Sequence, residues 1–166
     1  MFEKPLDVLQ HLMEPIRFMA LAGTYIPSTI YSLLTCHQYS DLRSPSGFKD
    51  AWFARFWSTY GPLIRADRAP QVAPLFTHLH GVVLDIGPGS GEWLSLFPKD
   101  HVTKIYGVEP NRDHHAALRK QIERCGLEGV YEIVPVGIED LGRGRWVKEE
   151  TVDGVVTVLC LCSVPR

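Results

Sequence analysis

The spacing of hydrophobic positions changes at about residue 81 of this chain. Before it, apolar residues recur at helical intervals, most clearly in an aromatic stripe with steps of three and four. The stripe consists of Phe48, Trp52, Phe53, Phe56, Trp57 and Tyr60. After it, short β-branched runs alternate with longer helical patterns. The chain is therefore predicted to have an N-terminal helical region followed by an α/β unit.

Four short apolar runs are predicted to be strands, at residues 82–86, 104–108, 130–136 and 153–159. Residues 112–125 form the clearest predicted helix, which Gly126 would end. Residues 92–97 are predicted as a shorter helix. Strands that alternate with helices predict a doubly wound parallel sheet, as in Rossmann-like folds.

The region before residue 81 is predicted to hold two parts, residues 1–47 and 48–80, ahead of the third part at 81–166. Residues 18–38 contain no Asp, Glu, Lys or Arg and are long enough to cross a bilayer. Pro27 instead favours two short helices, because proline disrupts a helix interior. Membrane-surface contact, a true span and a helix pair packed on its own domain all stay open.

The aromatic stripe is expected to lie on a helix over residues 48–60, ended by Gly61 and Pro62, with a further short helix over 71–80. Two interpretations of the stripe remain open. It packs on the sheet domain, or part of it lines an apolar substrate pocket or touches lipid.

The first predicted strand runs directly into the glycine-rich turn of residues 87–91. Glycine permits positive φ and lets a ligand approach the backbone, and a helix beginning at Glu92 would offer unpaired N–H groups to an anion. We therefore predict a nucleotide-type cofactor site. A dinucleotide fingerprint would need glycine where Glu92 stands, and no Gly-Lys-Ser or Gly-Lys-Thr of a phosphate loop follows.

A second acid follows at the end of the next predicted strand. Glu109 lies 22 residues beyond Gly87 and precedes Pro110 and Asn111. An acid at this place can accept hydrogen bonds from both ribose hydroxyls of an adenosine, as in dinucleotide-binding folds.

Residues 84–91, Leu-Asp-Ile-Gly-Pro-Gly-Ser-Gly, resemble the first motif of class I S-adenosylmethionine-dependent methyltransferases. Three further segments match that class in order: the strand ending at Glu109, residues 137–140, and residues 152–158. The resemblance implies S-adenosylmethionine as cofactor and the strand order third, second, first, fourth. It also implies a set of cofactor-binding residues: Asp85, Gly87, Pro88, Gly89 and Gly91 at the methionine end, Glu109, Pro110 and Asn111 at the ribose, and Glu139 or Asp140 near the adenine. It identifies no general base.

A narrower resemblance rests on residues 157–164 and on the hydrophobic N-terminal segment. Both are similar to the methyltransferase-like family that includes membrane-associated thiol methyltransferases. An Asn-Pro-Pro-Tyr-type motif is missing, which favours a small-molecule acceptor over DNA or protein. Class I enzymes continue beyond the fourth strand, whereas this chain stops at Arg166. We therefore expect a truncated chain whose fourth strand is an exposed apolar edge.

Two alternatives to an active methyltransferase stay open. One is a non-catalytic remnant that binds the cofactor, a membrane or a partner without turnover. The other is a nicotinamide-dependent oxidoreductase, which the residue at position 92 disfavours.

The charge and the cysteine spacing of the chain exclude further classes of function. The net charge of −2 gives no basis for nucleic-acid binding. Cys36, Cys125, Cys160 and Cys162 lack metal or disulfide spacing, which indicates reduced thiols in an intracellular protein, cytoplasmic or attached to an internal membrane. No metal site is expected. His114 and His115, adjacent on the predicted helix, are expected to be solvated or to cap it.

Overall fold

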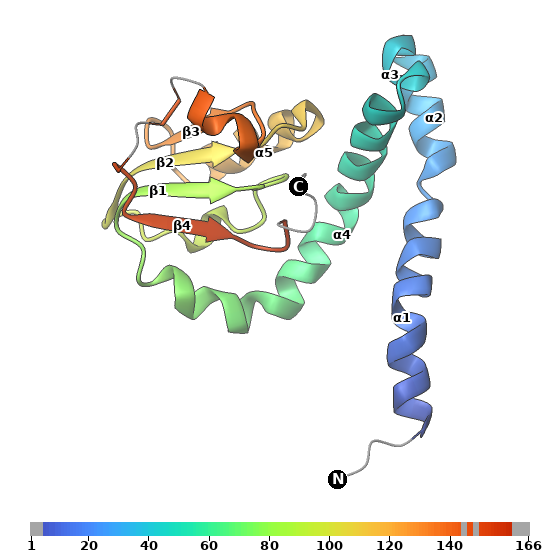
Figure 1. The fold of residues 1–166 in the computed structure, drawn as a ribbon, viewed down its shortest axis with the longest axis horizontal. Coiled ribbons are helices and arrows are strands. Elements are labelled where there is room, and N and C mark those ends of the chain that lie inside the picture. Colours follow the sequence, from blue (N-terminus) through green and yellow to red (C-terminus); the bar gives the residue numbers. More distant parts are fainter. Residues whose placement is uncertain (1–4, 144–145, 148–149, 161–166) are drawn as a thin grey trace. The chain divides into compact units, whose positions relative to one another are not determined.

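The computed structural model describes residues 5–143, 146–147 and 150–160 (Figure 1). It divides into two compact units, Met1–Phe56 and Trp57–Arg166. The boundary falls inside helix α4 (Pro45–Phe76), so each unit contains part of that helix.

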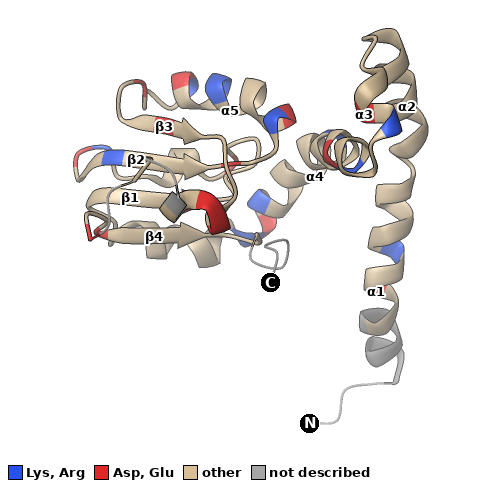
Figure 2. Ribbon diagram, turned by 45° about the horizontal axis from the view of Figure 1, so that its top comes forward, with Lys and Arg blue, Asp and Glu red and all other residues tan. Residues whose placement is uncertain are grey.

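The first unit contains α1 (Pro5–Gly23), α2 (Ile26–Thr35), α3 (Tyr39–Arg43) and the beginning of α4. Thr24 and Tyr25 separate α1 from α2, and Pro27 lies in the first turn of α2, where a proline is tolerated. The predicted division of residues 18–38 into two helices is therefore confirmed. Helix α2 is tan in Figure 2 because it carries no charged residue. Among the described helices, none combines the length and hydropathy that a membrane crossing requires.

The beginning of α4 packs within this first unit. Phe18 and Tyr25 make edge-to-face contacts with Phe56, at ring-centroid distances of 5.3 and 5.7 Å. The indole Nε1 of Trp52 donates a hydrogen bond of 2.8 Å to the carbonyl of Ala22. These members of the aromatic stripe therefore contact α1 and the turn after it, which neither of the two interpretations had proposed.

Helix α4 continues through three prolines, so the predicted stop at Gly61 and Pro62 is wrong. Tertiary packing explains the difference. A Cβ at Gly61 would lie 2.7 Å from a carboxylate oxygen of Glu92, so glycine lets the helix approach the loop that holds this acid. Farther along, Phe76 is buried in the core of the second unit and holds the end of α4 on the sheet.

The second unit is built on a parallel sheet of four described strands. They are β1 (Gly81–Ile86), β2 (Val102–Val108), β3 (Tyr131–Val134) and β4 (Gly154–Thr157). Their order is β3-β2-β1-β4, and every pairing is parallel (Figure 1). The predicted α/β fold, Rossmann-like with strand order 3-2-1-4 and N-terminal helices, is confirmed. In the described sheet β4 is an edge strand, and its Val155 is 57% exposed.

Two apolar clusters cover the two faces of this sheet. On one face, Val83 and Ile105 pack against Leu118 of α5 (Arg112–Arg124), against the end of α4 and against the segment after the glycine turn. On the other face, Leu84, Val108 and Val134 pack near the 3-10 helix η2 (Ile138–Arg143). The outer side of α5 carries charges of both signs (Figure 2).

The segment after the glycine turn is not an α-helix. It forms turns and one short 3-10 helix, η1 (Leu94–Leu96). Trp93, Leu94 and Phe97 are all buried in the core, and Pro98 follows at once, which disfavours helical backbone before it. The prediction that a helix N-terminus binds an anion here is therefore wrong.

Candidate functional site at the carboxyl ends of the strands

The four strands end level with one another on the side where the predicted site residues lie. Ile86 pairs with Val108 on one side and with Thr157 on the other, and Val108 pairs with Val134. The loops that follow these residues therefore share one edge of the sheet. The strand order reverses between β1 and β4, which is where open α/β sheets bind ligands.

The glycine turn after β1 has the backbone conformation that glycine favours. Gly87, Gly89 and Gly91 have φ values of +67°, +58° and +88°. Pro88 and Gly89 are buried. Gly91 packs on α5, since a Cβ there would lie 3.0 Å from Leu118. The turn therefore exists in the form that the sequence implied, with its last glycine serving the contact to α5.

Glu109 binds directly to this turn. Its Oε2 accepts a hydrogen bond of 2.9 Å from the backbone N–H of Gly89, and its Oε1 accepts one of 2.9 Å from the N–H of Asn111. Asn111 in turn caps α5, because its side chain accepts from the N–H of Asp113. Glu109 is 6% exposed. Two residues that the sequence placed in one site therefore lie in contact, and Glu109 has a fixed position.

Asp85, the other acid of the site, is 5% exposed and accepts a hydrogen bond of 2.8 Å from the hydroxyl of Tyr131 on β3. The phenol crosses β2 at Gly107, where a Cβ would overlap the ring. Neither Tyr131 nor Gly107 was among the predicted site residues. A glycine inside a strand often indicates that another group approaches the backbone closely, so Gly107 could have indicated this contact.

Burial raises the pKa of Asp85 from 3.8 to about 7. The hydrogen bond from Tyr131 favours the ionised form and acts against this shift, whereas the negative charge of Glu109 adds to it. The site therefore holds a carboxyl group that changes charge near neutral pH.

Glu92 is a third buried acid at the turn, and it was also not among the predicted site residues. The residue is 8% exposed, and its side chain accepts hydrogen bonds from Trp57 and Ser90. Burial raises its pKa. In the sequence, the only indication of a role for Glu92 was its position after the three glycines. That position was used only to argue against a dinucleotide-binding site.

His114 and His115 are buried, so the prediction that they are solvated or cap the helix is wrong. The ring of His114 lies 3.3 Å from the Ser90 hydroxyl, and Nε2 of His115 lies 2.8 Å from the Glu109 carbonyl oxygen. Burial, followed by the nearby charge of His115, lowers the pKa of His114 to about 4. The first turn of α5 faces the site, which explains why both rings are covered.

Glu139 and Asp140 lie in the loop after β3, in the first turn of η2. Glu139 is exposed and folds back on Gly137, and the N–H of Asp140 donates to the Gly137 carbonyl over 3.1 Å. Pro110 is exposed beside Glu109. Each of these residues therefore lies in a loop at the expected edge of the sheet.

The cysteines divide into two groups. Among the described residues, Cys36, Cys125 and Cys160 form no disulfide, and the side chain of Cys160 lies against Gly87. Cys162 lies outside the described residues. In the described part of the chain, no three His, Cys, Asp or Glu side chains form a group that could hold a metal.

A family model described as a methyltransferase domain matches residues 64–166, which include the whole sheet and the glycine turn. The chain belongs to this methyltransferase domain family. No curated protein matches it.

One solved structure supports the fold of this methyltransferase domain, and two others match it more weakly. A candidate S-adenosyl-L-methionine-dependent methyltransferase from Methanococcus maripaludis shares 17% identity over 68% of this chain, with a TM-score of 0.50. A conserved hypothetical protein of Streptococcus pyogenes matches 43% of the chain at 22% identity and a TM-score of 0.37. A SAM-dependent methyltransferase from Thiobacillus denitrificans, in complex with S-adenosyl-L-homocysteine, matches 55% of the chain at 23% identity and a TM-score of 0.40. The chain spans 50%, 46% and 36% of these three proteins.

In the methyltransferase domain, Asp85 and His114 are expected to give the free energy of unfolding opposite dependences on pH. The folded state holds the pKa of Asp85 at about 7, above its ordinary 3.8, so stability falls as pH rises from about 4 to 7. It holds the pKa of His114 at about 4, below 6.5, so stability falls as pH drops from 6.5 to 4. Between pH 4 and 6.5 the two effects oppose each other.

Single variants should separate the two contributions to the pH dependence of the free energy of unfolding. Asp85→Asn leaves the His114 effect, so stability should rise by up to about 1.4 kcal/mol per pH unit between pH 4 and 6.5 relative to wild type. In His114→Gln, which leaves the Asp85 effect, stability should instead fall with pH over this range relative to wild type. Urea unfolding at three pH values measures both, with the exposed His78→Gln as the control. Slopes of the same sign in the two variants would contradict the assignment.

Proposed function

We propose that this methyltransferase domain binds S-adenosylmethionine and transfers its methyl group to a small-molecule acceptor. The observation that carries the proposal is the contact of Glu109 with the glycine turn, in a chain that belongs to a methyltransferase domain family. The fold match adds the expected position of the site, at the reversal of strand order.

Glu109 is the proposed acceptor for the ribose hydroxyls. Two backbone N–H groups hold its carboxylate in place. A carboxylate accepts about four hydrogen bonds, so these two are compatible with further bonds to a ribose. The glycine turn would then hold the methionine end, and Glu139 or Asp140 would lie toward the adenine.

The buried acids fit a positively charged cofactor. Asp85 is buried beside Glu109, and none of the ion pairs among the described residues includes Asp85. Buried carboxylates are stable when a cation pairs with them or when they bind a proton. A cofactor with a positive sulfur would provide that partner.

When bound, S-adenosylmethionine supplies a methyl group on a positively charged sulfur, and transfer leaves a neutral thioether. The protein contributes position and exclusion of water, because an in-line displacement needs the acceptor atom aligned with the breaking bond. Glu109 would fix the adenosine, and the turn would orient the methionine. The acceptor class rests on the missing Asn-Pro-Pro-Tyr motif.

Equilibrium binding to the 166-residue chain tests the cofactor. We expect S-adenosylmethionine and S-adenosylhomocysteine to bind and to compete with each other. NAD⁺ should not displace them, because Glu92 replaces the third glycine of a dinucleotide fingerprint. Displacement by NAD⁺ alone would support the oxidoreductase alternative.

Catalysis requires a separate test, because the chain spans about half of the first solved structures that it matches. A tritiated-methyl transfer assay should compare this chain with a version extended to the length of those proteins. Binding without transfer in the 166-residue chain, together with transfer in the longer one, would favour the non-catalytic alternative for this chain.

Contact with a membrane surface through α1 and α2 is a second proposal. Exposed apolar side chains at helical spacing support it, namely Leu12, Ile16 and Met19 on α1 and Ile26, Ile30 and Leu34 on α2. Flotation with phospholipid vesicles tests the contact. Met19→Glu with Ile30→Glu should reduce it, and unchanged flotation would contradict the proposal.

A further inference from the structure

Trp57 of α4 packs against the glycine turn, and both belong to the second unit. Its indole Nε1 and Cδ1 lie 3.0 and 3.3 Å from the position that a Cβ of Gly89 would take. Nε1 also lies 3.0 Å from the corresponding position at Gly61, four residues farther along α4. Glycine at both positions therefore leaves room for the indole against the helix and the turn.

Glu92 connects this indole to the turn. The residue is buried, and its carboxylate accepts a hydrogen bond from Trp57 and bonds from the hydroxyl and the backbone N–H of Ser90. A carboxylate can accept about four hydrogen bonds. One side chain therefore holds both the helix and the turn.

Gly89 is thereby held at two points. Its backbone N–H donates to Glu109 over 2.9 Å, and the Trp57 indole covers the side where a Cβ would stand. Glycine has more backbone freedom than any other residue, so a ligand that needs one conformation of a glycine turn loses affinity in ordering it. Contacts that order the turn before the ligand arrives therefore strengthen binding.

We propose that Trp57 is a positioning residue of the cofactor site, which acts through the backbone of Gly89. The inference rests on the proposed function, in which the turn holds the cofactor. The family match begins at residue 64, so Trp57 and Gly61 lie before it. The cofactor site of this chain then extends to a part of α4 outside the matched domain.

Trp57→Phe tests the proposal, because phenylalanine keeps an aromatic ring but has no N–H to donate to Glu92. We expect S-adenosylhomocysteine to bind about tenfold more weakly, the size of effect that ordering the backbone of one residue gives. Without ligand, NMR-detected hydrogen exchange of the Gly89 N–H should become about tenfold faster, because the turn opens more easily.

Trp52→Phe is the matched control. Trp52 is also half-buried on α4, and its indole also donates a hydrogen bond, but to the carbonyl of Ala22 in the first unit. The change should alter Kd and the exchange rate of Gly89 by less than about twofold. Urea unfolding of both variants separates loss of binding from loss of fold.

Two changes at Glu92 provide a second test, which stands even if Trp57→Phe folds poorly. Glu92→Gln keeps an acceptor oxygen for the indole, whereas Glu92→Leu has none. We expect Glu92→Leu to weaken binding more than Glu92→Gln. The double variant of Glu92→Leu with Trp57→Phe should lose less affinity than the product of the single effects, because both changes remove the same contact.

The outcomes separate this inference from the proposed function. Wild-type affinity, or wild-type exchange of Gly89, in Trp57→Phe would overturn the inference while cofactor binding stands. Equal losses in Trp57→Phe and Trp52→Phe, equal affinities of the two Glu92 variants, or independent effects in the double variant would also overturn it. Failure of S-adenosylhomocysteine to bind the wild-type chain would overturn the proposed function itself.

Discussion

Glu109→Gln is expected to weaken S-adenosylmethionine binding by about 100-fold. A glutamine amide has one acceptor oxygen, so its NH₂ group would face a backbone N–H of Gly89 or Asn111 where a carboxylate oxygen now accepts. Ribose hydroxyls would also lose a charged acceptor. Hydrogen bonds to charged groups contribute about 1.5–3 kcal/mol each, and 1.4 kcal/mol corresponds to a factor of ten in Kd.

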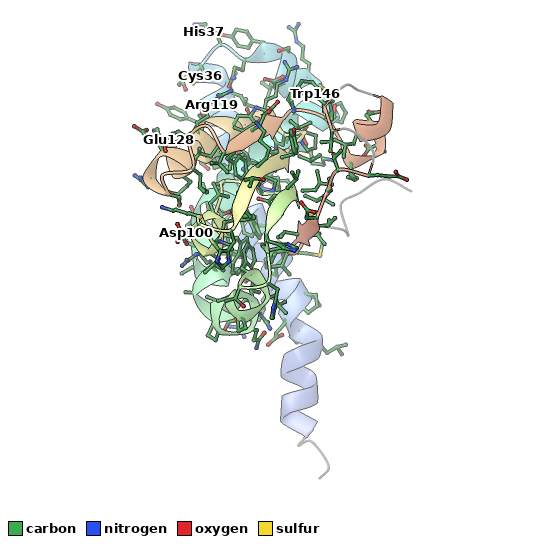
Figure 3. The ribbon with its side chains drawn as sticks, turned by 90° about the vertical axis from the view of Figure 1, so that its left-hand side faces the viewer. Cys36, His37, Asp100, Arg119, Glu128 and Trp146 are labelled. Atoms are coloured by element: carbon green, nitrogen blue, oxygen red, sulfur yellow. The ribbon has the colours of Figure 1, made fainter. Side chains whose placement is uncertain are left out.

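The matched control is Glu128→Gln. Glu128, labelled in Figure 3, is exposed in the loop before β3, so it lies at the amino end of the sheet, away from the Glu109 side. It should change Kd by less than about twofold. Urea unfolding of both variants separates loss of binding from loss of fold. Equal Kd values for the two variants would remove Glu109 from the site.

Gly107→Ala is expected to lower the free energy of unfolding by about 3 kcal/mol. The added methyl group would occupy the place of the Tyr131 phenol, so the ring must move and its hydrogen bond to Asp85 breaks. Overpacking costs about 1–3 kcal/mol, and loss of a partner for a buried polar group costs a similar amount.

Two further variants show whether contact with Tyr131 is the cause. Gly142→Ala is the control, because nothing lies within 4 Å of a Cβ there, and it should change stability by less than about 0.5 kcal/mol. Tyr131→Leu combined with Gly107→Ala should cost less than the sum of the single changes. Additive costs in urea unfolding would show that the ring and the glycine act independently.

The parts of the fold that local patterns encode were predictable. Short apolar runs separated by a helix and by turn residues predicted the strands, and the turn at residues 87–91 fixed the end of β1. The position of Glu109 at the tip of the next strand predicted its place beside the turn, where it bonds to Gly89. These inferences need only periodicity and the rule that parallel strands end at one edge.

The errors arose where tertiary contacts override local signals. Gly61 and Pro62 favour a helix stop, yet α4 continues through both, and Gly61 lies close against Glu92. Trp93 and Phe97 suited an amphipathic helix, but the core holds them in turns around η1. Neither contact can be deduced from neighbouring residues.

Burial of the polar groups could also not be predicted from the sequence. The path from Tyr131 across Gly107 to Asp85 depends on the register of three strands, which spacing alone does not set. The unusual pKa of Asp85 follows from that burial. The site was therefore located from the sequence, whereas its protonation chemistry required the structure.

A crystal structure of the chain with S-adenosylhomocysteine tests the central claim most directly. We predict electron density for an adenosine whose ribose oxygens lie within about 3 Å of the Glu109 carboxylate, a hydrogen-bond distance. The homocysteine part should lie along the turn of residues 87–91. Density for the ligand elsewhere on the protein, with Glu109 still bound only to Gly89 and Asn111, would contradict the account.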